Sequence, residues 1–160
     1  MTWTYLGGLD VLVSIERSRA RITSLAQRVT ELAGRASEES VKPLLEAAVI
    51  ELREAMLMHF AKEQEGLFPF VIANAQGMEK SVARLAKEHE ALSAAVVRME
   101  QVVHRKTRSR NGAEPLDTAV KRFNALYTNY APTETRFLRR VDARLDDGQR
   151  LDLATLVRGL

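Results

Sequence analysis

Apolar residues recur at alternating intervals of three and four positions through four long stretches of this 160-residue chain. Such spacing aligns apolar side chains along one stripe of an α-helix, the stripe that faces a core. No stretch alternates apolar and polar residues in the manner of a β-strand. The short connections between the stretches predict an all-α chain folded as an up-down-up-down four-helix bundle. The four stretches cover 9–33, 37–72, 78–107 and 116–145.

Local signals suggest where these helices begin and end. Ser37, followed by two glutamates, is expected to cap the second helix, and Pro69 is expected to bend or fray its end. Residues 108–115 are expected to form an exposed loop between the third and fourth helices. An Asp-Asp-Gly sequence at 146–148 should end the fourth helix, and 151–157 predicts a short C-terminal helix.

Polar residues interrupt the apolar stripes at six positions where leucine or isoleucine would be expected. The third and fourth stretches repeat the pattern of the first two at almost equal intervals, which suggests that all six positions lie at one level of the bundle. A carboxylate at such a level is costly to bury unless a cation or several donors meet it. The six residues are Arg19, His59, Glu63, His89, Tyr130 and Glu134.

The residue types at this level favour a metal ion. His59 and Glu63 are four positions apart, so both side chains lie on one face of a helix, and His89 can approach them from another helix. Imidazole and carboxylate ligands without thiolate suit iron, manganese or zinc. The chain has no cysteine, which excludes disulfides, iron–sulfur clusters and cysteine-based zinc sites.

Two segments resemble motifs of the hemerythrin-like family, the HHE cation-binding domains. One is His-Phe-Ala-Lys-Glu-Gln-Glu-Gly-Leu-Phe-Pro at 59–69, and the other is Leu-Ala-Lys-Glu-His-Glu-Ala-Leu at 85–92. The resemblance implies that His59 and His89 are terminal ligands and that Glu63 and Glu134 are bridging ligands of two irons. It also implies handling or sensing of oxygen, nitric oxide or iron.

The chain departs from the family pattern on two helices. Arg19 and Tyr130 stand where the family carries histidines, and Gln64 replaces a second glutamate found in many members. Arg19 cannot ligate a metal because its guanidinium stays protonated, whereas Tyr130 can offer a phenolate to ferric iron. Pro132 is expected to kink the fourth helix and displace its half of the site.

Three interpretations remain open at this point. The first is a single-metal site with His59, Glu63, His89, Tyr130 and Glu134 as ligands. The second is a two-metal site in which Arg19 swings away and Glu16 is recruited. The third is a metal-free bundle that acts as an interaction or regulatory protein, with the charge of Arg19 in place of the metal.

Composition narrows the remaining possibilities. The length suits one domain over 1–160, and 46% hydrophobic and 28% charged residues are ordinary for a globular protein. A net charge of +3 is too small to favour a nucleic-acid partner, and no run approaches the roughly 18 apolar residues of a membrane span. Without a recognisable signal peptide, the expected compartment is the cytoplasm.

No nucleophile motif is present, which favours a binding protein over an enzyme, although a carboxylate-bridged oxidase is the enzymatic alternative. A homodimer or a protein partner also remains open.

Overall fold

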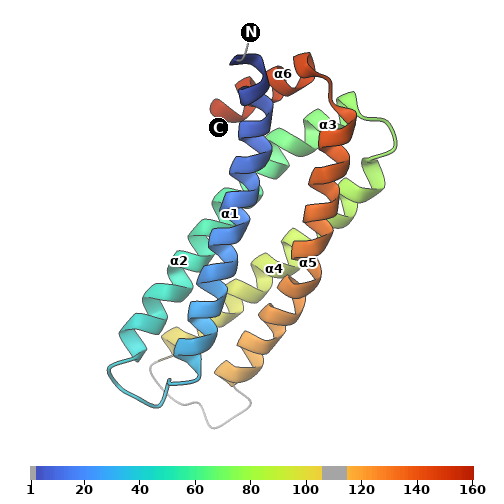
Figure 1. Ribbon diagram of the computed structural model, residues 1–160. Coiled ribbons are helices and arrows are strands. Elements are labelled where there is room, and N and C mark those ends of the chain that lie inside the picture. Colours follow the sequence, from blue (N-terminus) through green and yellow to red (C-terminus); the bar gives the residue numbers. More distant parts are fainter. Residues whose placement is uncertain (1–2, 106–114) are drawn as a thin grey trace.

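The computed structural model describes residues 3–105 and 115–160, which are helical almost throughout and contain no strand (Figure 1). Four long antiparallel helical rods form the bundle, and the second rod consists of three consecutive segments. The predicted fold class, an all-α up-down-up-down bundle with a short C-terminal helix, is confirmed. The elements are α1 (Trp3–Ala33), α2 (Lys42–Ala61), η1 (Lys62–Leu67), α3 (Phe68–Asn74), α4 (Glu79–His104), α5 (Leu116–Arg144) and α6 (Asp147–Arg158).

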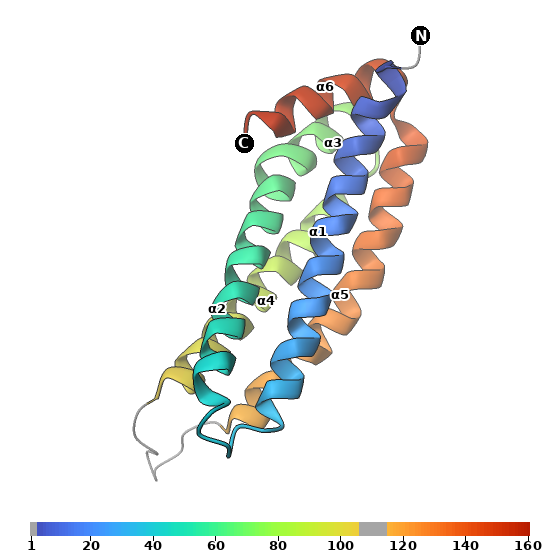
Figure 2. The same cartoon turned by 60° about the vertical axis from the view of Figure 1, so that its left-hand side comes forward.

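Each rod packs against two neighbours, so the bundle is square in section. Helix α1 contacts α2 and α5, and α4 contacts the same two helices from the opposite corner. Helix α6 lies across one end of the bundle, where it packs on α1 and η1 (Figure 2). The apolar stripes read from the sequence fill the interior, with Ile15, Leu52, Leu92 and Phe123 each no more than 1% exposed. Within the described residues, no helix is both long and apolar enough to cross a bilayer.

The second rod begins later than expected. Ser37 does not cap it, because residues 34–41 form successive turns and the helix starts at Lys42. Pro43 lies in the first turn, where its missing N–H leaves no hydrogen bond unmade. The proline determines this start better than the capping residues that precede it in the sequence.

A π-helical turn interrupts the second rod at η1, which carries Glu63. The N–H of Phe68 donates to the carbonyl of Glu63, five residues earlier, so the turn is one residue wider than an α-turn. Pro69 then occupies the first turn of α3, and the rod continues to Asn74 instead of fraying. Gly66 lies in the same turn, and a Cβ at this position would come within 3.1 Å of side chains of Val157 and Leu160. Helix α6 therefore packs closely on the turn because position 66 has no side chain.

Other boundaries also differ from expectation. Pro132 lies inside α5 at an exposed position, and the helix continues through it to Arg144, so the expected displacement of this half of the site is wrong. The C-terminal helix starts at Asp147 instead of Leu151, because Asp146 and Gln149 form a capping box. Helix α4 ends at His104, and the loop predicted at 108–115 lies largely outside the described residues.

Gly77, in the turn between α3 and α4, has a φ of 80°. This left-handed conformation strains any residue with a Cβ, so Gly77→Ala is expected to lower the free energy of unfolding by about 1 kcal/mol. Gly148 is the matched control, since it has no positive φ and a Cβ there would make only ordinary contact with Asp146. Urea denaturation of both variants measures the difference. Equal stability of the two variants would contradict this account of the turn.

Candidate metal centre

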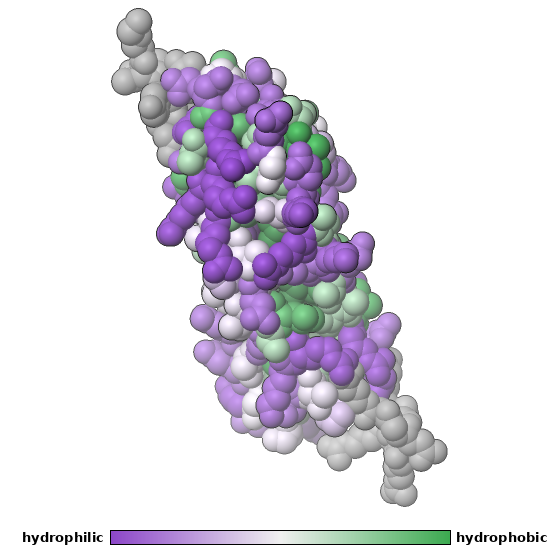
Figure 3. Space-filling view, turned by 90° about the vertical axis from the view of Figure 1, so that its right-hand side faces the viewer, coloured by the Kyte–Doolittle hydropathy of each residue, from purple (hydrophilic) through white to green (hydrophobic). Residues whose placement is uncertain are grey.

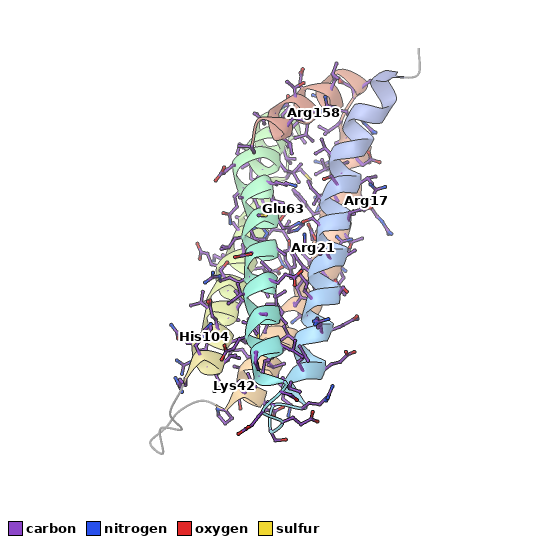
Figure 4. All side chains as sticks on the ribbon, turned by 90° about the vertical axis from the view of Figure 1, so that its left-hand side faces the viewer. Arg17, Arg21, Lys42, Glu63, His104 and Arg158 are labelled. Atoms are coloured by element: carbon purple, nitrogen blue, oxygen red, sulfur yellow. The ribbon has the colours of Figure 1, made fainter. Side chains whose placement is uncertain are left out.

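All six polar stripe residues meet at one level inside the bundle. They come from every rod: Arg19 from α1, His59 and Glu63 from the second rod, His89 from α4, and Tyr130 and Glu134 from α5. Figure 4 shows Glu63 at about the level of the turn of α1 that bears Arg17 and Arg21, the neighbours of Arg19. His59, Glu63, His89, Tyr130 and Glu134 are each at most 1% exposed. The sequence-derived expectation that these side chains converge is therefore met.

The Tyr130 hydroxyl lies at the middle of this polar cluster. Its oxygen is 3.2 Å from Nε2 of His59 and 3.3 Å from Nε2 of His89. It also lies 3.2 Å from Oε2 of Glu63, to which it can donate its proton. One phenol thus joins the second rod, α4 and α5 at a single point.

The two carboxylates lie beside the same imidazole nitrogens. Oε1 of Glu134 is 2.8 Å from Nε2 of His59, and Oε2 of Glu63 is 2.8 Å from Nε2 of His89. Oε2 of Glu63 also lies 3.7 Å from Nε2 of His59. Ligand atoms of His59, Glu63 and Glu134 all fall within 4.8 Å of one another.

Neighbouring side chains fix the orientation of both imidazole rings. Nδ1 of His59 is 3.0 Å from the Ser18 hydroxyl, and Nδ1 of His89 is 3.1 Å from Nε2 of Gln64. The remote nitrogen of each ring is therefore engaged, and both Nε2 atoms face the interior. For His59, the Ser18 hydroxyl can accept the Nδ1 proton and leave Nε2 free, as the second hydrogen bond of a histidine ligand does in metalloproteins. The amide nitrogen of Gln64 donates to Nδ1 of His89, so in this structure the proton of that ring lies on Nε2.

Aromatic rings hold His89 further. The Phe60 ring stacks on it at a centroid distance of 3.9 Å and an interplanar angle of 14°. Phe68 stacks on it at 5.5 Å and 18°. Burial lowers the pKa of His89 to about 3, with a further contribution from the nearby His59. His89 is consequently neutral at physiological pH, which is the form that can ligate a metal.

The two buried glutamates are in different electrostatic states. Burial, followed by the charge of Glu134, raises the pKa of Glu63 well above its usual value. Burial also acts to raise the pKa of Glu134, but hydrogen bonds from His59 and Glu63 and the charge of Arg19 outweigh it, so this pKa is lowered. Burial and both carboxylates raise the pKa of Tyr130. Without a metal, one carboxylate therefore carries the negative charge, while Glu63 and the phenol hold their protons.

The guanidinium of Arg19 forms an ion pair with the charged carboxylate of Glu134. Its NH1 lies 3.1 Å from Oε2 of Glu134, and its side chain is 16% exposed. The backbone carbonyl of Arg19 accepts hydrogen bonds from the hydroxyls of Thr23 and Tyr127, both at 3.1 Å. Glu16, the ligand considered for a second ion, lies on an exposed position of α1.

The donor atoms have the spacing of ligands around one cation. Metal–nitrogen and metal–oxygen bonds of about 2.0–2.2 Å place neighbouring ligand atoms about 3 Å apart, close to the 2.8–3.7 Å separations of these donor atoms. Oε1 of Glu63 is buried and has no hydrogen-bond partner among the described residues. Such an unpaired carboxylate oxygen is rare in a protein interior and is free to bind a cation. His59, Glu63 and Glu134 therefore fit one metal ion, and the Tyr130 hydroxyl and His89 lie beside them.

Comparison with known proteins agrees with this chemistry. The family model for the hemerythrin HHE cation-binding domain matches residues 15–148. The chain therefore belongs to the hemerythrin HHE family, and the resemblance seen in the sequence is confirmed. No curated protein and no solved structure matches the chain.

Several contributors to the site were not foreseen from the sequence. Ser18 and Gln64, which orient the histidines, lie outside the apolar stripes, and Gln64 had been noted only as a departure from the family. Phe60 and Phe68 lie close to His59 in the sequence, but they stack on His89 of another helix, which the sequence does not indicate. The π-turn that carries Glu63 has no comparable sequence signal.

Proposed function

We infer that the chain binds a single non-haem metal ion, with iron the best candidate. The proposed ligands are His59, Glu63, His89, Tyr130 and Glu134. The observation that carries the proposal is the convergence of two imidazole nitrogens and two carboxylates, from three rods, around one phenol oxygen. Family membership supports a cation at this level of the bundle.

The donor set supports iron, and the position of Arg19 supports one ion over two. Two imidazoles, two carboxylates and a phenol make a nitrogen and oxygen set without sulfur, and phenolate is a ligand suited to ferric iron. In a paired site, Glu134 would use its second oxygen for the second ion. That oxygen already lies 3.1 Å from the guanidinium of Arg19, whose fixed positive charge would repel a second cation.

A bound iron would supply a Lewis-acid centre that can take up a small diatomic molecule such as oxygen or nitric oxide. The chain's own residues would exclude water from it, because every proposed ligand is at most 1% exposed. The apolar residues Met56 and Leu92, also fully buried, lie on the same stripes one turn away from His59 and His89. These features support handling or sensing of a small ligand or of iron itself over conversion of an organic substrate.

Ferric loading of the purified protein is expected to give one iron per chain and a broad visible absorption band from phenolate on iron. Tyr130→Phe should remove the band and retain iron, because four proposed ligands remain. Tyr127→Phe is the matched control, since the Tyr127 hydroxyl bonds to Thr23 and to the carbonyl of Arg19. Elemental analysis and visible spectroscopy measure the two quantities. An unchanged band in Tyr130→Phe would remove Tyr130 from the ligand set, and two irons per wild-type chain would contradict the single-ion site.

The Arg19–Glu134 ion pair supports a second candidate function. In the metal-free bundle the guanidinium already neutralises the buried charge, and Glu63 and Tyr130 keep their protons. Such a chain would act through its surface, as an interaction or regulatory protein. The absence of stoichiometric metal in protein purified from iron-supplemented cells and then incubated with ferrous and ferric iron would favour this second function.

A further inference from the structure

A small cleft opens on the outer face between α4 and α5, away from the buried centre. Ser81, Arg84 and Leu85 of α4 line it together with Thr133, Arg136, Phe137 and Arg140 of α5, and its volume is about 160 Å³. The side of the molecule seen in Figure 3 carries many strongly hydrophilic residues over its upper half. Three arginines and two hydroxyl groups thus surround an apolar floor made by Leu85 and Phe137.

The arginines of this cleft are poorly neutralised. Arg84 pairs with Glu88, its Nε lying 3.2 Å from the carboxylate. Within the described part of the chain, neither Arg136 nor Arg140 forms an ion pair. Arg140 instead donates to the Ser81 hydroxyl across the cleft at 3.0 Å, and Arg136 donates to the Thr133 hydroxyl at 3.4 Å. The cleft therefore carries an excess of two positive charges.

This arrangement concentrates positive charge that a bound anion would neutralise. Arg136 and Arg140 are one helical turn apart, a spacing at which like charges repel. Arg140 also reaches toward α4, where Arg84 adds a third guanidinium. Guanidinium groups together with hydroxyl donors are the groups that bind phosphate oxygens, often in a bidentate manner. A phosphate in the cleft would offset the repulsion between Arg136 and Arg140 with charge-assisted hydrogen bonds.

We propose that the cleft between α4 and α5 is a binding site for the phosphate group of a small phosphate ester. The volume supports a small group, because drug-sized ligands usually occupy about 300–1,000 Å³. The hydroxyls of Ser81 and Thr133 provide donors on both walls, and the apolar floor offers contact to the carbon atoms of the ester. The site is separate from the metal centre, so the failure of either proposal leaves the other unaffected.

Titration of the intact protein with glycerol 3-phosphate and with inorganic phosphate, by calorimetry at low ionic strength, tests the site. The double variant Arg136→Gln/Arg140→Gln is expected to weaken binding by more than about tenfold, because it removes two charge-assisted interactions. The control Arg17→Gln/Arg28→Gln removes the same charge from exposed positions of α1 and should change affinity by less than roughly twofold. All four substituted side chains are exposed, so both variants should fold, which circular dichroism verifies. Equal metal content in all samples ensures that a difference in phosphate affinity between the variants does not arise at the metal centre.

The outcomes separate the alternatives. Binding by the wild type that is lost only in the cleft variant supports the site. No binding by the wild type, or an equal loss in both variants, overturns it. Phosphatidylcholine vesicles containing phosphatidic acid distinguish the source of the phosphate. Competition between these vesicles and glycerol 3-phosphate would assign the site to a lipid headgroup, and lack of competition would assign it to a soluble ester.

Discussion

Replacing His59 by alanine is expected to abolish stoichiometric metal binding. Its Nε2 lies within 3.2 Å of both Tyr130 and Glu134, so this one ring connects the second rod to α5. Loss of a side chain that only orients a ligand weakens metal binding by about 10–100-fold, and loss of the ligand itself should exceed the upper end of that range. Iron content after loading and dialysis measures the effect.

The appropriate control is His104→Ala. His104 is the last residue of α4, its side chain is 44% exposed, and it lies near the opposite end of the bundle from α6 (Figure 4). This variant should retain wild-type iron content. Full retention of iron by His59→Ala would contradict the proposed ligand set. If the wild type carries no metal, His59→Ala should cost only packing and hydrogen bonds, about 2 kcal/mol of stability.

The interior location of the six polar residues could be predicted because it depends on local periodicity. Residues four apart share a face of any α-helix, so His59 and Glu63 had to point the same way once the apolar stripe was assigned. The near-repeat between the two halves of the chain then placed Tyr130 and Glu134 at the same level. Both inferences need no knowledge of packing, and the structure agrees with both.

The backbone around Glu63 could not be predicted in the same way. A π-turn has no strong local sequence signal, and this one lies where α6 packs closely on Gly66. The predicted start of the second helix was wrong for a related reason. Ser37 has the right chemistry for a cap, but the turns at residues 34–41 and Pro43 place the helix start at Lys42. In both cases the surrounding structure set the backbone conformation of the segment, and the conformational preference of the local sequence alone did not predict it.

The ion-pair partner of Arg19 could not be predicted from the sequence either. Periodicity places the residue on the core stripe, but a long side chain can reach several groups from one Cα position. The sequence left two alternatives for Arg19: its charge takes the place of a metal, or its side chain moves away from the site. The structure pairs it with Glu134, 3.1 Å away. This contact favours the charged form of Glu134, whereas Glu63 keeps its proton.

Replacing Arg19 by leucine is therefore expected to destabilise the metal-free protein by about 3 kcal/mol, because removal of one partner leaves a buried charge uncompensated. Glu134 has no solvent exposure and Arg19 has little. The hydrogen bonds of Thr23 and Tyr127 to position 19 use its backbone carbonyl and should survive the change. Urea denaturation in the presence of a chelator measures the loss.

A double-mutant cycle identifies the cause of that loss. In a Glu134→Gln background the same substitution should cost much less, since no charge remains to be neutralised. An equal cost in both backgrounds would show that Arg19 acts through packing alone.

The stabilisation that iron gives to each protein provides the final comparison. A bound cation beside Glu134 supplies the positive charge that leucine lacks, so iron should stabilise Arg19→Leu more than it stabilises the wild type if the centre binds metal. If iron stabilises neither protein, the guanidinium itself is the resident cation of this core, and the metal-free function is the correct one.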